Sequence, residues 1–435
     1  MFFALAGLLL ARFLSAQDLN RARMDSLLDI LAKNDRFMGS VSVTRAGEVI
    51  YARAVGYADV GTKMAADART KYRIGSISKT FTTVLALKAV EEGKLRLDET
   101  LDRYYPTIPN ASKITLEQML GHRSGIHSVT DDSLYLSWNT QPQTEASLLA
   151  KILAVKPPFE PGTKSEYSNS NFILMTFILH RAFGKPYAQL LQEKIIQPLG
   201  LKDTYVGGRI DLKEHEAQSY EYEGGWKQST ETDMSVPLGA GAIVSTPTDI
   251  NLFSTALFEG RLISTEHAER MKKLQDGFRL GLFAIPYYGK MSYGHTGGID
   301  GFRSVFSYFP DSRISYAMTS NALRYEMNNI SIGMLNSIFQ KPFALPDFRS
   351  VAVSPADLDK LKGEYTSKDL PIAITIRHDG KSLIAHPEGQ GQLTLNAKSP
   401  TTYSEPSVGV DFEFVPASGK MLVTQGGRTF TYTRK

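Results

Sequence analysis

Alternating apolar and polar positions mark two regions of the chain as antiparallel sheet. From Met38 to Tyr57 apolar residues recur at every second position on both sides of Arg45-Ala46-Gly47-Glu48, which predicts a β-hairpin with one buried face. The alternation returns from Phe302 to Thr319 around the turn-forming segment Pro310-Asp311-Ser312-Arg313. We therefore expect sheet strands near the beginning of the chain and again from Phe302 on.

Apolar spacings of three and four residues predict helices between these strands. Residues 76–92 carry apolar side chains at helical spacing, and Gly93 is a residue type that commonly follows a helix end. Ser76 is therefore expected to open a helix. From about Asp98 to Val206 the periodicity is mostly helical and is interrupted by prolines and glycines, which predicts a helical insert. A further helix is expected over residues 329–339.

The last part of the chain changes to short strand-like runs. Residues 341–355 contain three prolines and little periodicity, as linkers do. Beyond them, strand-like runs alternate with turns, which predicts a small antiparallel β-barrel. We expect a main domain over residues 17–340, a linker over 341–355 and a barrel domain over 356–435. The expected strands are Ile372–Ile376, Gln392–Leu395, Val410–Val415, Met421–Thr424 and Thr429–Thr433.

Residues 1–16 are expected to be a signal peptide. The apolar run from Met1 to Ala11 is too short to cross a bilayer but has the length of a signal-peptide core, and cleavage after Ala16 fits the pattern. The alternative is a buried N-terminal helix. Because the chain has no cysteine for a disulfide or a lipid anchor, an exported form is expected to be free in the periplasm or medium, with no transmembrane span after cleavage.

Length, composition and charge indicate a folded protein without a nucleic-acid partner. The 435 residues exceed the usual size of a single core, so one large and one smaller domain are expected. The 49 basic and 45 acidic side chains give a net charge of +4 with no basic run, which argues against nucleic-acid binding. His122 and His127 lack the clustered spacing of a zinc site, and we expect neither a metal nor a cofactor.

Ser76 and Lys79 form a candidate catalytic pair. Because they lie three residues apart at a helix start, their side chains share one face, and the lysine amine can reach the serine oxygen. A serine nucleophile needs a base, and a lysine serves as one only where burial or cationic neighbours lower its pKa. The site should therefore be partly enclosed. By itself the pattern also fits a helix cap with a solvated lysine.

Two further segments carry candidate polar groups. Tyr167-Ser168-Asn169 lies on a loop leading into a helix expected from about Asn171, where a phenol can relay a proton and an amide can hold a substrate. The alternative is a turn tyrosine followed by a helix cap. His295-Thr296-Gly297-Gly298 precedes the strand at Phe302, and its glycines let a substrate backbone approach closely.

Taken in order, these segments resemble the three-part signature of penicillin-binding proteins and serine β-lactamases. The motifs are Ser76-Ile77-Ser78-Lys79, Tyr167-Ser168-Asn169 and His295-Thr296-Gly297, and the tyrosine form points to the class C-like branch. The resemblance covers about residues 38–339. It implies an α/β (α+β) fold with an antiparallel sheet flanked by helices. The predicted barrel resembles the lipocalin-like appendage of some peptidases in this group.

The resemblance also implies roles for the motif residues. Ser76 is expected to be acylated, while Lys79 and Tyr167 share general-base and general-acid work. The backbone N–H groups of Ser76 and Gly298 are expected to form the oxyanion hole, which stabilises the charge that develops during acyl transfer.

Asn169, His295 and Thr296 are expected to contact the substrate. Typical class C β-lactamases have lysine at the position of His295, whereas histidine there is similar to DD-peptidases and D-aminopeptidases of the group. The resemblance therefore implies a peptide with a D-residue as substrate. We also expect the charge of His295 to change between about pH 5 and 8, so that its imidazolium form attracts a substrate carboxylate.

Three functions follow as alternatives. The first is a serine peptidase on D-amino-acid-containing peptides, of the DD-carboxypeptidase or D-aminopeptidase type. The second is a carboxylesterase or weak β-lactamase on the same scaffold, since esters need less leaving-group protonation than amides. The third is a non-catalytic, penicillin-recognising binding or sensor protein, against which the complete set of Ser76, Lys79 and Tyr167 argues. In the first two cases the expected partner is a small-molecule or peptide substrate.

Overall fold

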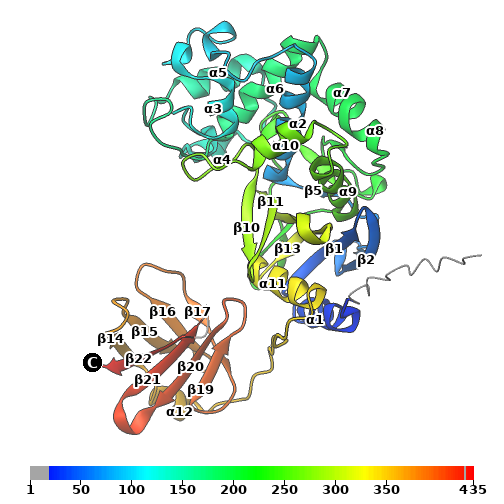
Figure 1. Cartoon of the computed structure of the whole chain (residues 1–435). Helices are drawn as coiled ribbons and strands as arrows, with labels where there is room; N and C mark the ends of the chain where they lie inside the picture. The colour runs from blue at the N-terminus through cyan, green and yellow to red at the C-terminus, as the bar shows by residue number, and fades with distance from the viewer. Residues whose placement is uncertain (1–18, 426–427) are drawn as a thin grey trace, which may run out of the picture. The chain divides into compact units, whose positions relative to one another are not determined.

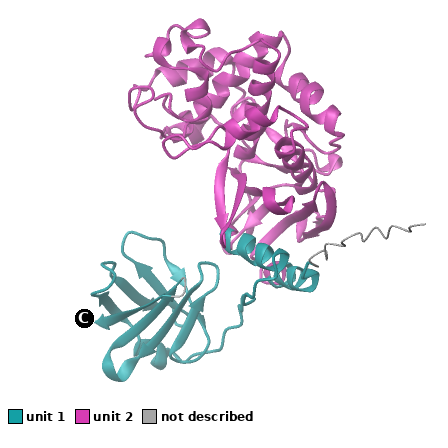
Figure 2. Ribbon diagram, in the orientation of Figure 1, with its two compact units in different colours: residues 1–30, 328–435 teal, residues 31–327 magenta. Residues whose placement is uncertain are grey.

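The structure is a computed structural model that describes residues 19–425 and 428–435 (Figure 1). The chain divides into two compact units (Figure 2). Unit 2 is formed by residues 31–327, and unit 1 takes in the described residues up to Ile30 and those from Asn328 on. The signal peptide expected over residues 1–16 lies outside the described residues. Within the described part of the chain, no helix is both long and apolar enough to span a bilayer.

An antiparallel sheet forms the framework of unit 2, residues 31–327. Its strands run in the order β10 (Phe283–Tyr287), β11 (Lys290–Ile299), β12 (Phe302–Phe309), β13 (Ile314–Leu323), β1 (Phe37–Arg45) and β2 (Glu48–Val55). Two short strands extend it from β13, namely β7 (Tyr220–Tyr222) and β8 (Trp226–Gln228). Because β1 pairs with β13, the early hairpin and the late strands predicted from the sequence belong to one sheet.

The β1–β2 hairpin follows from its turn residues. Ala46 and Gly47 have positive φ angles of 52° and 85°, the left-handed conformation that matches a two-residue turn to the twist of its strands. The predicted hairpin is therefore confirmed. The expectation of one buried face does not hold for β1, which is buried along both faces except at Arg45, because it lies between two strands and packs against the helix Pro247–Phe258.

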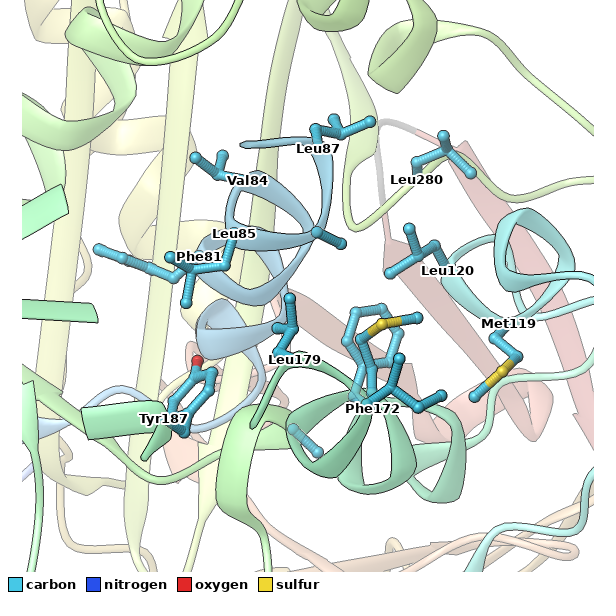
Figure 3. Close-up of a cluster of buried hydrophobic side chains, with 14 of the residues drawn as sticks. Phe81, Val84, Leu85, Leu87, Met119, Leu120, Phe172, Leu179, Tyr187 and Leu280 are labelled. Atoms are coloured by element: carbon cyan, nitrogen blue, oxygen red, sulfur yellow. The ribbon is translucent and has the colours of Figure 1, made fainter. Parts of the chain in front are cut away.

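Helices occupy the segment between these strands, as the periodicity predicted. They are α2 (Ser78–Glu91), α3 (Leu116–Leu120), α4 (Tyr135–Trp138), α5 (Glu145–Leu153), α6 (Asn169–Phe183), α7 (Tyr187–Leu191), α8 (Gln197–Leu199), α9 (Pro247–Phe258) and α10 (Thr265–Lys272). The helix α2 is central: its residues from Ser78 to Leu87 are all buried, as expected for a helix enclosed on every side. Figure 3 shows its apolar side chains beside Phe172 and Leu179 of α6.

The end of the chain forms a nearly closed antiparallel barrel. Its strands are β14 (Gly363–Ser367), β15 (Ile374–His378), β16 (Leu383–Pro387), β17 (Leu393–Thr394), β18 (Asn396–Ala397), β19 (Thr402–Glu405), β20 (Val410–Val415), β21 (Lys420–Gln425) and β22 (Arg428–Arg434). The first and last strands in the sheet order, β17 and β18, are consecutive in the chain and are separated by Leu395. The Leu395 N–H donates to the Leu383 carbonyl at 2.9 Å, which draws the two ends together.

The proline-rich segment before the barrel is partly attached to it. Residues 341–354 contain no helix or strand, and the short helix α12 (Pro355–Asp359) follows. The N–H of Val351 donates to the carbonyl of Ala397 at 2.9 Å, and the Lys398 ammonium donates to the carbonyl of Asp347 at 2.7 Å. The second half of the predicted linker is thus held against β18. The division into domains at residues 340 and 355 stays a prediction.

Candidate active site

Ser76 lies on a tight turn between a short strand and the central helix. The strand β5 (Tyr72–Arg73) is followed by a 3-10 turn, Gly75–Ile77, and α2 begins at Ser78, so Ser76 precedes the helix by two residues. Gly75 has a φ of 51°, and a Cβ built on it would lie 2.8 Å from the backbone nitrogen of Gly298. Only glycine fits there, and this close approach brings Gly298 of β11 beside the turn that carries Ser76.

Lys79 is buried within the first turn of α2 and contacts Ser76. Its Nζ atom lies 2.9 Å from Ser76 Oγ, 2.7 Å from Asn169 Oδ1 and 2.8 Å from the carbonyl oxygen of Ala240. The side chain is fully buried, and this desolvation lowers the pKa of Lys79 well below its usual value. Lys79 is thus enclosed, as we expected for a lysine that acts as a base.

The contacts of Lys79 fit a neutral amine, which has two N–H groups and one lone pair. The Asn169 Oδ1 and Ala240 carbonyl oxygens can only accept, so they take the two N–H groups. The lone pair is then left for the Ser76 hydroxyl. The Asn169 amide is held in this orientation because its Nδ2 group donates to Thr130 Oγ1 at 2.7 Å. Such an arrangement can remove a proton from Ser76.

Tyr167 is a second ionisable side chain beside Ser76. Burial raises the pKa of its phenol above the usual range, while a hydrogen bond with Ser76 acts in the opposite direction. The phenol is therefore protonated at neutral pH and can pass a proton rather than carry a permanent charge. Its ring centroid lies 4.9 Å from Lys79 Nζ.

His122 holds the loop that carries Tyr167. Its ring stacks on Tyr167 with the centroids 4.4 Å apart, and its Nδ1 accepts a hydrogen bond from the Ser168 N–H at 3.0 Å. The His122 carbonyl accepts from the N–H of Glu166 at 2.9 Å. Burial, together with the nearby Lys79, lowers the pKa of His122 well below its usual value. His122 is therefore a neutral positioning group.

His295 differs from the expectation that it titrates near neutral pH. It lies within β11, rather than ahead of a strand, and is only 2% exposed. The ring stacks on Phe283, and its Nδ1 donates to the Thr296 carbonyl at 2.5 Å. Burial and the nearby Lys79 lower the pKa of His295 to about 3, so the imidazole is neutral at working pH. The predicted attraction of a substrate carboxylate by its imidazolium form is therefore wrong.

Gly297 of the third motif allows close packing within the protein, whereas we expected its glycines to let a substrate backbone approach. A Cβ built on Gly297 would lie 2.0 Å from the carbonyl oxygen of Ile74, so this glycine lets β11 pack against the backbone leading to Ser76. Thr296 and Gly298 lie on the opposite, exposed face of β11. The roles of Thr296 in substrate contact and of Gly298 in the oxyanion hole stay predictions.

A pocket of about 340 Å³ opens beside Ser76. Three of the predicted site residues line this pocket, namely Ser76, Asn169 and Gly298. Ala240 lines it as well. Tyr167, His295 and Thr296 are not among its lining residues. Pockets of about 610 and 770 Å³ lie elsewhere, but neither contains any of the motif residues. We therefore take the smaller pocket as the candidate substrate site.

Sequence reasoning missed several residues that orient this site. Thr130 and Ser128 bind the Asn169 amide, and the Ala240 carbonyl binds Lys79. A backbone acceptor such as the Ala240 carbonyl has no sequence signal. Arg73 was also missed, although it pairs with Asp300 at 3.0 Å and so links β5 to the end of β11. The available signal was an arginine three residues before the candidate nucleophile.

In the described residues, no group of three or more histidine, cysteine, aspartate or glutamate side chains is arranged to hold a metal ion. The expectation of no metal and no cofactor stays a prediction.

Known proteins with related sequences and folds belong to one group. The Beta-lactamase family model matches residues 22–333. Penicillin-binding protein 4* of Bacillus subtilis (strain 168) is 24% identical over 426 residues, covering 91% of this chain and 93% of that protein. Teichoic acid D-alanine hydrolase of Staphylococcus aureus (strain NCTC 8325 / PS 47) is 24% identical over 279 residues, covering 62% of this chain and 68% of that protein.

A solved structure agrees with these relatives. D-amino acid amidase from Ochrobactrum anthropi SV3, complexed with L-phenylalanine amide, superimposes with a TM-score of 0.66 and 26% identity, covering 74% of this chain and 99% of that one. The predicted β-lactamase/transpeptidase-like fold is thereby confirmed. The chain belongs to the Beta-lactamase family and is a serine hydrolase.

Proposed function

We propose that the protein hydrolyses its substrate through an acyl-enzyme on Ser76. The observation that carries the proposal is the buried Lys79 amine 2.9 Å from Ser76 Oγ, with its two N–H groups engaged elsewhere. Ser76 Oγ attacks the substrate carbonyl carbon while its proton passes to Lys79 Nζ, directly or through the Tyr167 hydroxyl. The bond to the leaving group then breaks, and the leaving group takes up that proton. Water repeats the sequence, releases the acid and restores Ser76.

The charge that develops on the carbonyl oxygen has a proposed binding site in the backbone. The N–H groups of Ser76 and Gly298 form the oxyanion hole, supported by the close packing of Gly75 against Gly298. Asn169 contacts the substrate and also orients Lys79, while Thr296 and His295 lie along β11 beside the hole.

The proposed substrate is an amide or peptide that contains a D-amino acid. The likeness to D-amino acid amidase and to teichoic acid D-alanine hydrolase supports this class. It does not separate a DD-carboxypeptidase from a D-aminopeptidase, and the same nucleophile can cleave esters or react with a β-lactam. The complete base arrangement disfavours the alternative of a non-catalytic sensor.

Substrate profiling tests this proposal and separates its alternatives. The panel contains D- and L-aminoacyl p-nitroanilides, a p-nitrophenyl ester and a chromogenic cephalosporin, each assayed with wild type, Ser76→Ala and Ser165→Ala. Ser165 lies two residues before Tyr167 and serves as the matched serine control. We expect turnover of the D-aminoacyl compounds that disappears only in Ser76→Ala. Turnover of the ester or the cephalosporin alone would replace the peptidase assignment by an esterase or a β-lactamase. Failure of a fluorophosphonate to label wild type would favour the non-catalytic sensor protein.

We also propose that the protein is exported by cleavage after Ala16. The apolar run at residues 1–11 supports this proposal. N-terminal sequencing of protein recovered from the periplasm or medium should give Gln17 as the first residue. Recovery of the full chain with Met1 from the cytoplasm would contradict it.

A further inference from the structure

The pocket beside Ser76 is lined by carboxylates and by no basic side chain. Glu221 and Asp300 both line it, whereas none of its lining residues in the described part of the chain is lysine, arginine or histidine. Lys79 and His295 lie close by, but neither is among the lining residues, and burial lowers the pKa of both. The pocket is therefore electronegative.

The two carboxylates differ in their partners. Asp300 is fixed, because its Oδ2 accepts from Arg73 at 3.0 Å and its Oδ1 accepts from Thr232 Oγ1 at 2.6 Å. Arg73 also pairs with Glu231 at 2.6 Å, so this arginine balances only one of its two carboxylates. Together Arg73, Asp300 and Glu231 carry one net negative charge.

Glu221 is the carboxylate that remains available to a ligand. It lies at an exposed position of β7, and its carboxylate makes no hydrogen bond or ion pair within residues 19–425 and 428–435. Lys227 lies directly opposite Glu221 in the β7–β8 register and adds a nearby positive charge, but its ammonium pairs with Glu223 at 3.0 Å. A cationic group in the pocket would find in Glu221 a partner that no protein side chain occupies.

The rest of the pocket suits an apolar side chain. Leu136, Ile173, Val236 and Ile299 line it, and Leu136 is 78% exposed in a helix of only four residues. A ligand that covers an exposed leucine at the rim of a pocket removes apolar surface from water, which favours binding. Apolar walls combined with an unpaired carboxylate match an apolar amino acid that carries a free ammonium group.

We propose that the enzyme selects substrates whose D-residue carries a free α-ammonium group, and that Glu221 is the residue that recognises this group. This inference rests on the proposed acyl-enzyme function and narrows it to the amino-terminal type, a D-aminopeptidase or D-amino acid amidase. A substrate recognised by its C-terminal carboxylate would instead place a negative charge among Glu221, Asp300 and Glu231.

One cation beside the pocket offers the opposite selectivity and is a suitable control. The Arg303 guanidinium lies beside Gly298 on the exposed face of β11, where a Cβ built on that glycine would be 3.7 Å from Nη1. Its Nη1 donates to the carbonyls of Phe302 at 2.7 Å and Asp300 at 3.0 Å. Both bonds use Nη1, so Arg303 is the residue that would recognise a carboxylate if the selectivity were the opposite one.

Three D-alanine p-nitroanilides test the inference, with the amino group free, N-acetylated or N-succinylated. They share one scissile bond and differ in charge, which is positive, neutral or negative. We compare kcat/KM for wild type, Glu221→Gln, Glu221→Asp, Glu223→Gln and Arg303→Gln. Glu223→Gln removes the same charge from the same hairpin outside the pocket.

Wild type should prefer the free-amine substrate, and Glu221→Gln should lower kcat/KM for that substrate alone by about tenfold, the effect of losing one exposed charge-assisted hydrogen bond. Glu221→Asp should retain most of the preference, and the two other variants should match wild type. A preference for the succinylated substrate, no preference among the three, or a loss in Arg303→Gln would overturn the inference. If a fluorophosphonate fails to label Ser76 in wild type, the proposed function fails as well.

Discussion

The hydrolase unit and the C-terminal barrel bury different kinds of side chain. In residues 31–327 the side chains of Arg73, Lys79, His122 and His295 are each at most 2% exposed. In the described residues from 356 on, the core is made of apolar and tyrosine side chains. The one buried charged residue there is Glu405, which binds the N–H of Ser407 two residues along the chain.

This difference separates a reactive region from a structural one. Burying a charged group costs free energy unless partners compensate, so a buried lysine without a carboxylate partner indicates a use other than stability. Lys79 is such a residue, whereas the barrel has none among its described residues. The comparison therefore assigns the chemistry to residues 31–327 and leaves recognition or assembly as the kind of role open to the barrel.

Removing the proton relay should have the largest effect on turnover. Tyr167→Phe keeps the ring that stacks on His122 but loses the hydroxyl beside Ser76. We expect kcat to fall by about a hundred- to ten-thousand-fold with little change in substrate binding, as for other lost proton transfers. Steady-state kinetics and a binding measurement on Ser76→Ala/Tyr167→Phe check this. Unchanged kcat would remove Tyr167 from the mechanism and weaken the contrast between the two regions.

The buried lysine should give stability a pH dependence that the barrel cannot supply. Burial lowers the pKa of Lys79 in the folded state, while in the unfolded chain it titrates at about 10.4. Between these two values the unfolded chain binds one proton more, so the free energy of unfolding rises with pH by about 1.4 kcal/mol per unit. Lys79→Met lacks this contribution.

The measurement is urea unfolding of wild type and Lys79→Met across the alkaline range. The free energy of unfolding of wild type minus that of the variant should increase between about pH 8 and 10. A difference independent of pH would mean that Lys79 is an ammonium ion in the folded enzyme. In that case its lone pair is not available to Ser76.

Deleting the barrel should have a smaller effect on activity. A chain ending at Ala344 stops before the segment that bonds to β18 and retains all three motifs. We expect it to fold and to keep kcat/KM for a small free-amine substrate within about threefold of the full chain, since domains with their own cores fold separately. Circular dichroism and kinetics test this. An insoluble or inert product would show that the barrel completes the fold or the site.

The smallest effect is expected at His295. Because the pKa of His295 is lowered to about 3, its titration should cause no rise or fall of kcat/KM between about pH 5 and 8. His295→Gln should therefore leave the shape of the profile unchanged in that interval, even if the absolute rate falls. If a rise or fall of kcat/KM seen in wild type disappears in the variant, His295 titrates in this interval, as expected from the sequence.

The sequence predicted the elements better than their surroundings. Alternation located β12 and β13, although nearly every residue of both strands is buried, and helical spacing located α2 within two residues. In the barrel, β14, β16, β18 and β19 were missed, since polar or proline residues occupy one or both of their ends. Short strands are defined by the partners they meet, and those partners come from distant parts of the chain.

The candidate site shows the same limit. The proximity of Ser76 and Lys79 was predictable because helical spacing fixes it. The charge of His295 was not, because it depends on burial within β11 beside Lys79, which no local pattern records. Glu221 carried no motif at all: it became a candidate only when the fold placed β7 beside the pocket of Ser76.

The most direct test of the central claim is to identify the acylated residue. Wild type and Ser76→Ala are mixed with a D-alanine p-nitrophenyl ester, quenched in acid within the first turnover, and digested for peptide mass spectrometry. We predict a D-alanyl group on the peptide that contains Ser76, at the serine itself, and no adduct in Ser76→Ala. An adduct on another residue, or the same adduct in both proteins, would contradict the assignment of Ser76 as the nucleophile.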